Sequence, residues 1–302
     1  MGWRRRWSGL LKEIINFVGN KNFCSLRIVE RFVMMDSFVN KKEQLKPKKY
    51  LGQNFLTDKN ILQKIIQVAD IKKTDYVLEV GPGKGVLTAE LCSRARKVLA
   101  VEKDKDLIQG LEDLHLPNLE LLSADIMKVA DSTIQEFFKG KEYRVIANLP
   151  YNITSQFLQA FLERDYAPTS MLLMLQKEVA QRICSKTGEH SVLSLSVQFF
   201  AEPKIQFFIK KNSFFPRPKV ESAIIAITNI RKNKFKIDSE KFFEIVKLGF
   251  GQKRKQLKNN LKKFGEAEVQ KCLVKMGYSA NARAEELTLE DWVLMAQSLA
   301  KL

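Results

Sequence analysis

Short apolar runs alternate with helix-length segments through the middle of the chain. The apolar runs, each as long as a strand, cover residues 76–80, 98–102, 119–122 and 145–148. Strands that alternate with helices predict right-handed βαβ units and a parallel sheet. Before them, apolar residues at helical spacing predict a helix over about residues 58–68. We therefore expect an α/β domain that begins shortly before this helix.

Further along, the pattern is less decisive. Residues 171–175, 193–200 and 222–228 are apolar enough for strands or for buried helices, and periodicity does not decide between them. Past residue 235, helical spacing of phenylalanine, leucine and valine takes over. We therefore divide the chain into a sheet domain over residues 46–232 and a small all-helical domain over residues 233–302.

Residues 1–45 form a basic extension ahead of these domains. Lys12 and Glu13 interrupt the apolar stretch that a secretory signal needs. An organelle transit peptide is a second interpretation, which Glu13 and Glu30 weaken. We interpret the extension as a disordered tail, or as residues upstream of a true start at Met34 or Met35.

The net charge of +17 is concentrated in two segments. Residues 1–50 hold 12 basic and 4 acidic residues, and residues 231–275 hold 14 and 5. Basic segments attract polyanions such as nucleic acid or an anionic membrane, and they also serve as solvated surfaces. No segment approaches the roughly 18 consecutive apolar residues of a membrane span. We therefore expect no membrane partner.

The cysteines argue against disulfide and metal chemistry. Cys24, Cys92, Cys184 and Cys272 lie far apart and form no C-x-x-C pair. Disulfide frameworks and zinc sites need closer spacing. We expect no bound metal and a cytoplasmic protein.

Candidate ligand-binding residues follow three successive predicted strands. The loop of residues 81–85 (G-P-G-K-G) lies between a strand and a helix, where glycines let the backbone approach a ligand. Its G-x-G-x-G spacing is the form usual in methyltransferases, whereas nicotinamide sites usually have G-x-G-x-x-G. Glu102 ends the second strand, where it can hold ribose hydroxyls, and Asp125 follows the third, where it can accept from an adenine amino group. Each feature alone is equally a turn or a capping carboxylate, but together they mark one sheet edge.

The fourth strand is followed by Asn148, Leu149, Pro150 and Tyr151, which have the form of the (N/D/S)-P-P-(Y/F) box of amino-methyltransferases. An adenine amino nitrogen is a poor nucleophile because its lone pair is delocalised. Hydrogen bonds to the Asn148 side-chain carbonyl and the Leu149 backbone carbonyl would localise that pair and align it with a sulfonium methyl group. Tyr151 would stack on a base that has left its own stack. The alternative is a proline turn after a strand, which the upstream glycines and acids disfavour.

Several separate blocks then point to one family. They are residues 51–56 (L-G-Q-N-F-L), the glycine loop, 148–153 (N-L-P-Y-N-I), 175–180 (L-Q-K-E-V-A), 214–222 (F-F-P-R-P-K-V-E-S) and 250–261 (F-G-Q-K-R-K-Q-L-K-N-N-L). From about Lys48 to the C-terminus the sequence resembles the KsgA-type ribosomal RNA adenine dimethyltransferases. One departure is His190-Ser191, where the family usually has Tyr-Gly. We interpret His190 as a loop residue because the expected chemistry needs no general base.

The resemblance implies a Rossmann-like class I methyltransferase sheet followed by the small helical domain, with S-adenosylmethionine as cofactor. For this cofactor it implies binding by Asn54 and Leu56 at the methionine end, Gly81 and Gly83 as a backbone cradle, Glu102 at the ribose, Asp125 at the adenine, and Asn148. It implies that Phe214 sandwiches the target base opposite Tyr151, although Phe214 can also be ordinary core. The RNA phosphates would be held by Lys253, Arg254, Lys255 and Lys258.

The implied reaction is dimethylation of the amino groups of two adjacent adenines, in a hairpin loop near the 3′ end of small-subunit (16S) rRNA. The implied partner is an immature ribosomal subunit, engaged by a monomeric enzyme. Three alternatives stay open at this point. They are a 23S rRNA adenine methyltransferase of the antibiotic-resistance kind, a non-catalytic nucleic-acid-binding factor of the same fold, and a DNA adenine methyltransferase. The last usually carries a target-recognition domain, which the short basic C-terminus does not resemble.

Overall fold

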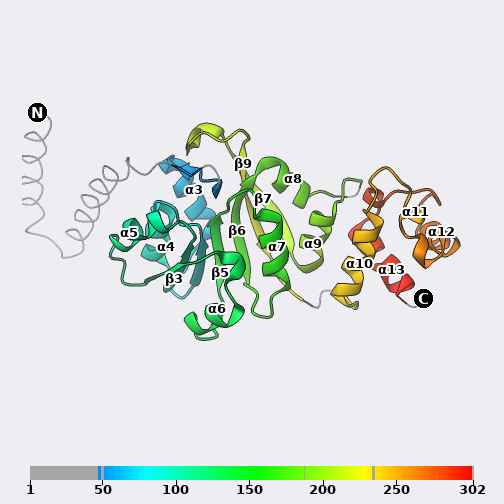
Figure 1. Cartoon of the computed structure of the whole chain (residues 1–302), viewed down its shortest axis with the longest axis horizontal. Coiled ribbons are helices and arrows are strands. Elements are labelled where there is room, and N and C mark those ends of the chain that lie inside the picture. The colour runs from blue at the N-terminus through cyan, green and yellow to red at the C-terminus, as the bar shows by residue number, and fades with distance from the viewer. Residues whose placement is uncertain (1–46, 49–50, 187, 233–234, 301–302) are drawn as a thin grey trace, which may run out of the picture. The chain divides into compact units, whose positions relative to one another are not determined.

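One mixed sheet of seven strands, in the order β4-β3-β2-β5-β6-β9-β7, organises the described part of the chain (Figure 1). The computed structural model describes residues 47–48, 51–186, 188–232 and 235–300, so the predicted extension over residues 1–45 lies outside the described residues. The strands are β1 (Phe55–Leu56), β2 (Tyr76–Val80), β3 (Lys97–Glu102), β4 (Leu119–Ser123), β5 (Arg144–Asn148), β6 (Ser170–Gln176), β7 (Glu202–Ile209), β8 (Phe214–Phe215) and β9 (Ser222–Thr228). The α-helices are α3 (Lys59–Ala69), α4 (Val86–Arg94), α5 (Lys105–Glu112), α6 (Asp131–Phe137), α7 (Thr154–Glu163), α8 (Lys177–Ile183), α9 (Val192–Phe200), α10 (Ser239–Gly249), α11 (Leu257–Asn260), α12 (Glu266–Lys275) and α13 (Leu289–Leu299).

The four strands predicted from the first apolar runs are confirmed, and they pair in parallel as expected. The strand β9 differs, because it runs antiparallel to both β6 and β7. The connection from β7 to β9, residues 210–221, contains no α-helix that crosses over the sheet, so the two neighbouring strands pair antiparallel. Strand order reverses direction between β2 and β5, which is where open α/β sheets bind their ligands.

Side chains on the two faces of the sheet enter two hydrophobic clusters. Leu78 and Val145 belong to one cluster with α7, whereas Val77 and Ile146 belong to the other with α3 and α4. This alternation follows from the two-residue period of a strand. The sheet is therefore covered on both faces, which explains why its central strands β2, β3, β5 and β6 are apolar along most of their length.

Residues 193–200, for which periodicity left strand or helix open, belong to the helix α9. The pair before this helix, His190 and Ser191, accounts for where it begins. Ser191 is the N-cap, since its hydroxyl accepts from the Ser194 backbone and the Ser194 hydroxyl accepts from the Ser191 backbone. Such a reciprocal cap satisfies two N–H groups that a helix end leaves open. His190 is buried directly before it, with Nδ1 3.5 Å from the Ser194 hydroxyl. Burial lowers the pKa of His190.

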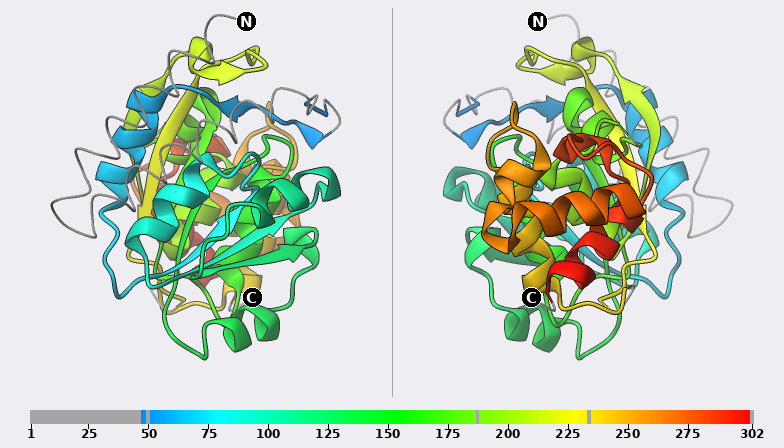
Figure 2. Two further views of the ribbon diagram at one scale, coloured as in Figure 1. Left: turned by 90° about the vertical axis from the view of Figure 1, so that its left-hand side faces the viewer. Right: turned by 90° about the vertical axis from the view of Figure 1, so that its right-hand side faces the viewer.

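The helices α10 and α13 pack against α9, and α11 and α12 pack against α10 and α13 (Figure 2). The first hydrophobic cluster therefore continues into these helices. The rings of Phe199 and Phe242 stack with centroids 4.3 Å apart. Lys48–Leu302 form one compact unit. No helix in the described ranges is long and apolar enough to cross a membrane.

Candidate active site

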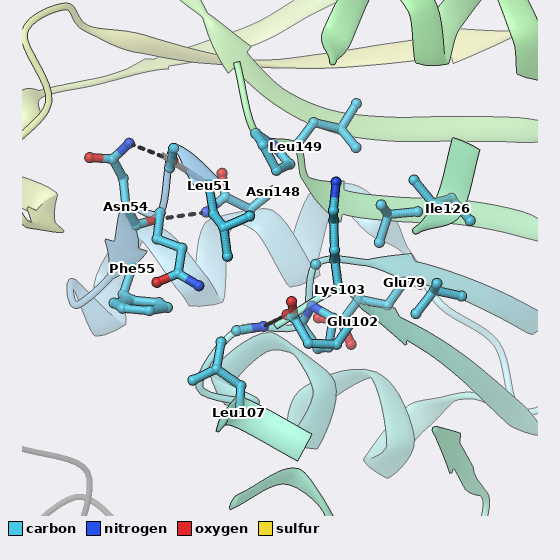
Figure 3. A pocket seen from close by; sticks show the side chains of 18 of the residues that line it. Leu51, Asn54, Phe55, Glu79, Glu102, Lys103, Leu107, Ile126, Asn148 and Leu149 are labelled. Carbon is cyan, nitrogen blue, oxygen red and sulfur yellow. Dashed lines mark hydrogen bonds between the residues drawn. The ribbon is translucent and has the colours of Figure 1, made fainter. Parts of the chain in front are cut away.

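A pocket opens at the carboxyl ends of β2, β3 and β5, beside the position where strand order reverses (Figure 3). It brings together every residue that the sequence suggested for cofactor binding. Those residues are Asn54, Leu56, Gly81, Gly83, Glu102, Asp125 and Asn148, and the pocket is also lined by Leu149, Pro150 and Tyr151. Parallel strands explain this convergence, because their carboxyl ends share one edge of the sheet.

The glycine loop has the backbone that only glycine adopts readily. Gly81 and Gly83 have φ values of +67° and +58°. A Cβ atom on Gly83 would also lie 3.1 Å from the ring of Phe55. A side chain here would therefore be strained and would obstruct the pocket wall.

Glu102 is buried and ties the glycine loop to the start of α5. Its two carboxylate oxygens accept from the backbone N–H groups of Gly83 (3.1 Å) and Asp104 (2.8 Å). Burial raises the pKa of Glu102, and the two backbone donors oppose that rise. The carboxyl group is thereby fixed at the pocket wall, where its remaining lone pairs can accept two ribose hydroxyls.

The segment before β1 is fastened over the same edge by Asp104. Its carboxylate accepts from Lys48 Nζ at 2.6 Å and from Gln53 Nε2 at 2.7 Å. This places Asn54 and Leu56 on the pocket wall. No sequence signal singled out Asp104, because its partners lie about fifty residues away.

Asp125 also lines the pocket, and each of its carboxylate oxygens has one partner. Its carboxylate accepts from the Met127 backbone N–H at 3.1 Å and pairs with Lys103 Nζ at 2.9 Å. The Lys103 ammonium lowers the pKa of Asp125. A ligand amino group that reaches Asp125 therefore meets an ionised acceptor.

The Asn148 amide has a defined orientation. Its Nδ2 donates to the Asn54 backbone carbonyl at 3.1 Å, and Asn54 Nδ2 donates to the Gly52 carbonyl at 3.1 Å (Figure 3). With the nitrogen engaged in this way, the Asn148 Oδ1 oxygen is the acceptor presented to a substrate. This is the orientation that the proposed activation of an amino group requires.

Tyr151 and Phe214 are placed differently. The Tyr151 hydroxyl lies 2.9 Å from Ser222 Oγ, which fixes a half-buried ring at the pocket wall, and burial raises its pKa. Phe214 is only 5% exposed, lies opposite Leu56 in the β1–β8 pair and belongs to the second hydrophobic cluster. It does not line the pocket, so its role as the second face of a base sandwich stays a prediction.

The sequence reasoning missed Glu79. This residue of β2 is 1% exposed, lines the pocket and has its Oε2 atom without a hydrogen-bond partner among the described residues. Burial, with a smaller contribution from Glu102, raises its pKa to about 8. A single acid inside an otherwise apolar strand, Y-V-L-E-V, was the available signal.

The predicted RNA-binding cations lie on the helical part of the chain. Lys253, Arg254 and Lys255 are exposed in the turn between α10 and α11, and Lys258 donates to Asn281 at 2.9 Å. Lys255 borders a hollow on that surface together with Lys247 and Lys262. The structure thus places the cations outside the pocket, where they can contact only a large ligand.

The pocket fits S-adenosylmethionine on its own chemistry. The unpartnered Glu79 oxygen suits a ligand that carries cationic groups, Glu102 suits ribose hydroxyls, and the glycine loop leaves space for a backbone contact. The fold and this pocket define a Rossmann-like, S-adenosylmethionine-dependent methyltransferase.

Comparisons with known proteins narrow this class. A family model described as ribosomal RNA adenine dimethylase matches residues 44–301. Ribosomal RNA small subunit methyltransferase A of Dehalococcoides mccartyi is 41% identical over 257 residues, covering 82% of this chain and 87% of the relative. The protein of the same name from Alkaliphilus oremlandii is 40% identical over 271 residues, covering 86% and 94%. The crystal structure of the 23S rRNA methyltransferase ErmE aligns with a TM-score of 0.66 at 26% identity, covering 82% of this chain and 99% of that one. The chain belongs to the ribosomal RNA adenine dimethylase family.

Proposed function

We propose that the chain dimethylates the N6 amino groups of two adjacent adenosines in a hairpin loop near the 3′ end of small-subunit rRNA. The observation that carries the proposal is the Asn148 amide, whose nitrogen is engaged by Asn54 and whose oxygen is left to accept from an amino group. Relatives about 40% identical, named for the small subunit, support this RNA over the 23S rRNA of the more distant ErmE. We propose that the enzyme acts as a cytoplasmic monomer on an immature subunit.

The residues divide the work between binding and activation. Glu79, Glu102, Asp125 and the glycine loop would hold S-adenosylmethionine, which supplies an electrophilic methyl group when bound. The Asn148 oxygen and the Leu149 carbonyl accept from the target amino group and direct its lone pair into the pocket. Tyr151, anchored on Ser222, stacks on the extruded base, and a single-stranded loop lowers the cost of extrusion.

We assign residues 46–232 to catalysis and residues 233–302 to RNA binding. The exposed cations Lys253, Arg254 and Lys255, together with Lys258 of α11, would contact phosphates of the surrounding rRNA. Such contacts position the RNA without reading its sequence.

The proposal is tested by offering three substrates in parallel with labelled S-adenosylmethionine. They are immature small subunits, large subunits and duplex DNA, and the methylated adenines are then mapped. Label at two adjacent adenosines of the small subunit is expected, whereas label confined to the large subunit refutes the substrate assignment. Asn148→Ala should abolish transfer while affecting cofactor affinity much less, and undiminished turnover would exclude the box as the catalytic element.

A further inference from the structure

A groove with basic walls lies beside the pocket, between α8 and the chain that connects β7 to β9. Four cations line it, contributed by Lys177, Lys210, Lys211 and Arg217, together with the carboxylates of Glu178 and Glu221. We call this surface the β7–β9 groove. Nothing in the family's reaction as derived above uses it.

The cations in this groove are only partly neutralised. Lys177 pairs with Glu221 at 2.8 Å, and this contact, with help from Lys211 and Lys210, lowers the pKa of Glu221. Within the described ranges, the exposed side chains of Lys210 and Arg217 make no hydrogen bond or ion pair. The groove therefore retains positive charge that suits an anionic ligand.

Two exposed aromatic rings accompany these cations. Phe208 is 48% exposed and Phe215 is 61% exposed, although large apolar side chains are normally covered. Lys177 Nζ lies 5.2 Å from the centroid of the Phe208 ring, and Phe215 precedes Arg217 by two residues. Cations interleaved with exposed aromatic rings are the combination that binds single-stranded nucleic acid, because the rings stack on unpaired bases.

The groove begins next to the residue that anchors Tyr151. Ser222, which contacts the Tyr151 hydroxyl, stands opposite Gln176 on β6 and Ile209 on β7. The next residues along those two strands are Lys177 and Lys210. On the other side, Phe215 stands opposite Phe55, which lines the pocket. An RNA strand that inserts a base into the pocket is thus led directly onto the groove.

We propose that the β7–β9 groove binds the single-stranded RNA adjacent to the target adenosine. Lys210 and Arg217 contact its phosphates, and Phe215 and Phe208 stack on its unpaired bases. The proposal rests on the proposed function for the class of ligand, but it assigns a second RNA-binding surface besides the C-terminal cations. It also explains why two phenylalanines stay exposed.

The charge contacts are tested by salt titration of RNA affinity. The probe is a hairpin RNA with two adjacent adenines in its loop. The double variant Lys210→Gln, Arg217→Gln is compared with Lys139→Gln, Lys141→Gln. The control removes two exposed cations just before β5, at the amino ends of the parallel strands. Each lost phosphate contact should reduce the slope of log affinity against log salt by about 0.7, hence about 1.4 for the groove variant and no change for the control. Equal slopes in the two double variants would overturn the charge assignment.

The stacking contact is tested at Phe215. Phe215→Ala should weaken hairpin affinity roughly 5- to 100-fold with an unchanged salt slope, and Phe215→Trp should retain affinity. Both variants should bind a blunt RNA duplex of equal length with the same affinity as the unmodified protein. Wild-type hairpin affinity in Phe215→Ala would refute stacking, and so would an equal loss on the duplex. Matching thermal unfolding curves check that these surface changes leave the fold intact.

The two proposals fail in different ways. If the unmodified protein leaves small subunits unmethylated, the proposed function fails, and hairpin affinity still reports on the groove. If the protein methylates small subunits and every groove variant binds the hairpin normally, only the groove assignment fails.

Discussion

Glu79 offers a sharp test of how the pocket is built. Its carboxyl group is buried, and its Oε2 atom has no partner among the described residues, so the ionised form is poorly accommodated. The substitution Glu79→Gln keeps the shape of the side chain and removes the titration. It should therefore change how the stability of the cofactor-free protein depends on pH.

The magnitude follows from the two pKa values. Burial raises the pKa of Glu79 from its ordinary value of 4.5 to about 8 in the folded protein, whereas the unfolded chain keeps the lower value. At pH values between about 4.5 and 8, Glu79 binds a proton in the folded protein but not in the unfolded chain. The contribution of Glu79 to the free energy of unfolding is therefore largest below about pH 4.5 and is lost as the pH rises toward about 8. The slope from this group approaches about 1.4 kcal/mol per pH unit, which amounts to a few kcal/mol over the window.

The assay is urea denaturation of the cofactor-free protein at pH 5, 6, 7 and 8. We expect the stability advantage of Glu79→Gln over the unmodified protein to grow with each step. The control is Glu136→Gln, which removes an exposed carboxyl group on α6 and should follow the unmodified protein. Parallel stability curves for Glu79→Gln and the unmodified protein would show that Glu79 does not titrate in this window.

Three other substitutions test the rest of the molecule. Replacing the cations at 253–255 with glutamine should reduce the salt slope of RNA binding by about 2, and an unchanged slope would place the phosphates elsewhere. Gly249→Ala would put a Cβ atom 2.4 Å from the Trp292 ring. It should lower the free energy of unfolding by roughly 1–3 kcal/mol, which denaturant titration measures, and wild-type stability would contradict this packing. Asp104→Asn weakens the contact that holds Lys48 and should reduce cofactor affinity about 10-fold by calorimetry, whereas equal affinity would mean that the contact does not position the site.

The sequence predicted the first half of the fold well because its signals are local there. The four parallel strands and the helix after Asp58 all carry short-range patterns, and Asp58 itself caps that helix. The two-residue strands β1 and β8 were not predicted, since they exist only because distant segments pair. Likewise, the apolar run at 193–200 has no period of its own, and the cap at Ser191 settles it as a helix.

The candidate site shows the same limit. Motif residues such as Glu102 and Asn148 were identified because each ends a strand, and the carboxyl ends of the parallel strands then bring them together. The hydrogen bonds that orient the side chains of the site could not be predicted from the sequence. The partners of Asn148 and Asp104 come from the distant segment around Gln53 and Asn54. Contacts between residues fifty to ninety positions apart leave no pattern in one sequence.

The stacked rings of Phe199 and Phe242 have a consequence for substrate choice. They join α9 to α10 within one continuous hydrophobic cluster, so close packing fixes the separation between the methylation pocket and the C-terminal cations. An RNA can engage both only when its own tertiary structure presents a backbone segment and an unpaired adenosine at the matching separation. Under the proposed RNA contacts of those cations, recognition should depend on the assembled geometry of the transcript more than on its sequence, and the same nucleotides in an unfolded strand should be poor substrates.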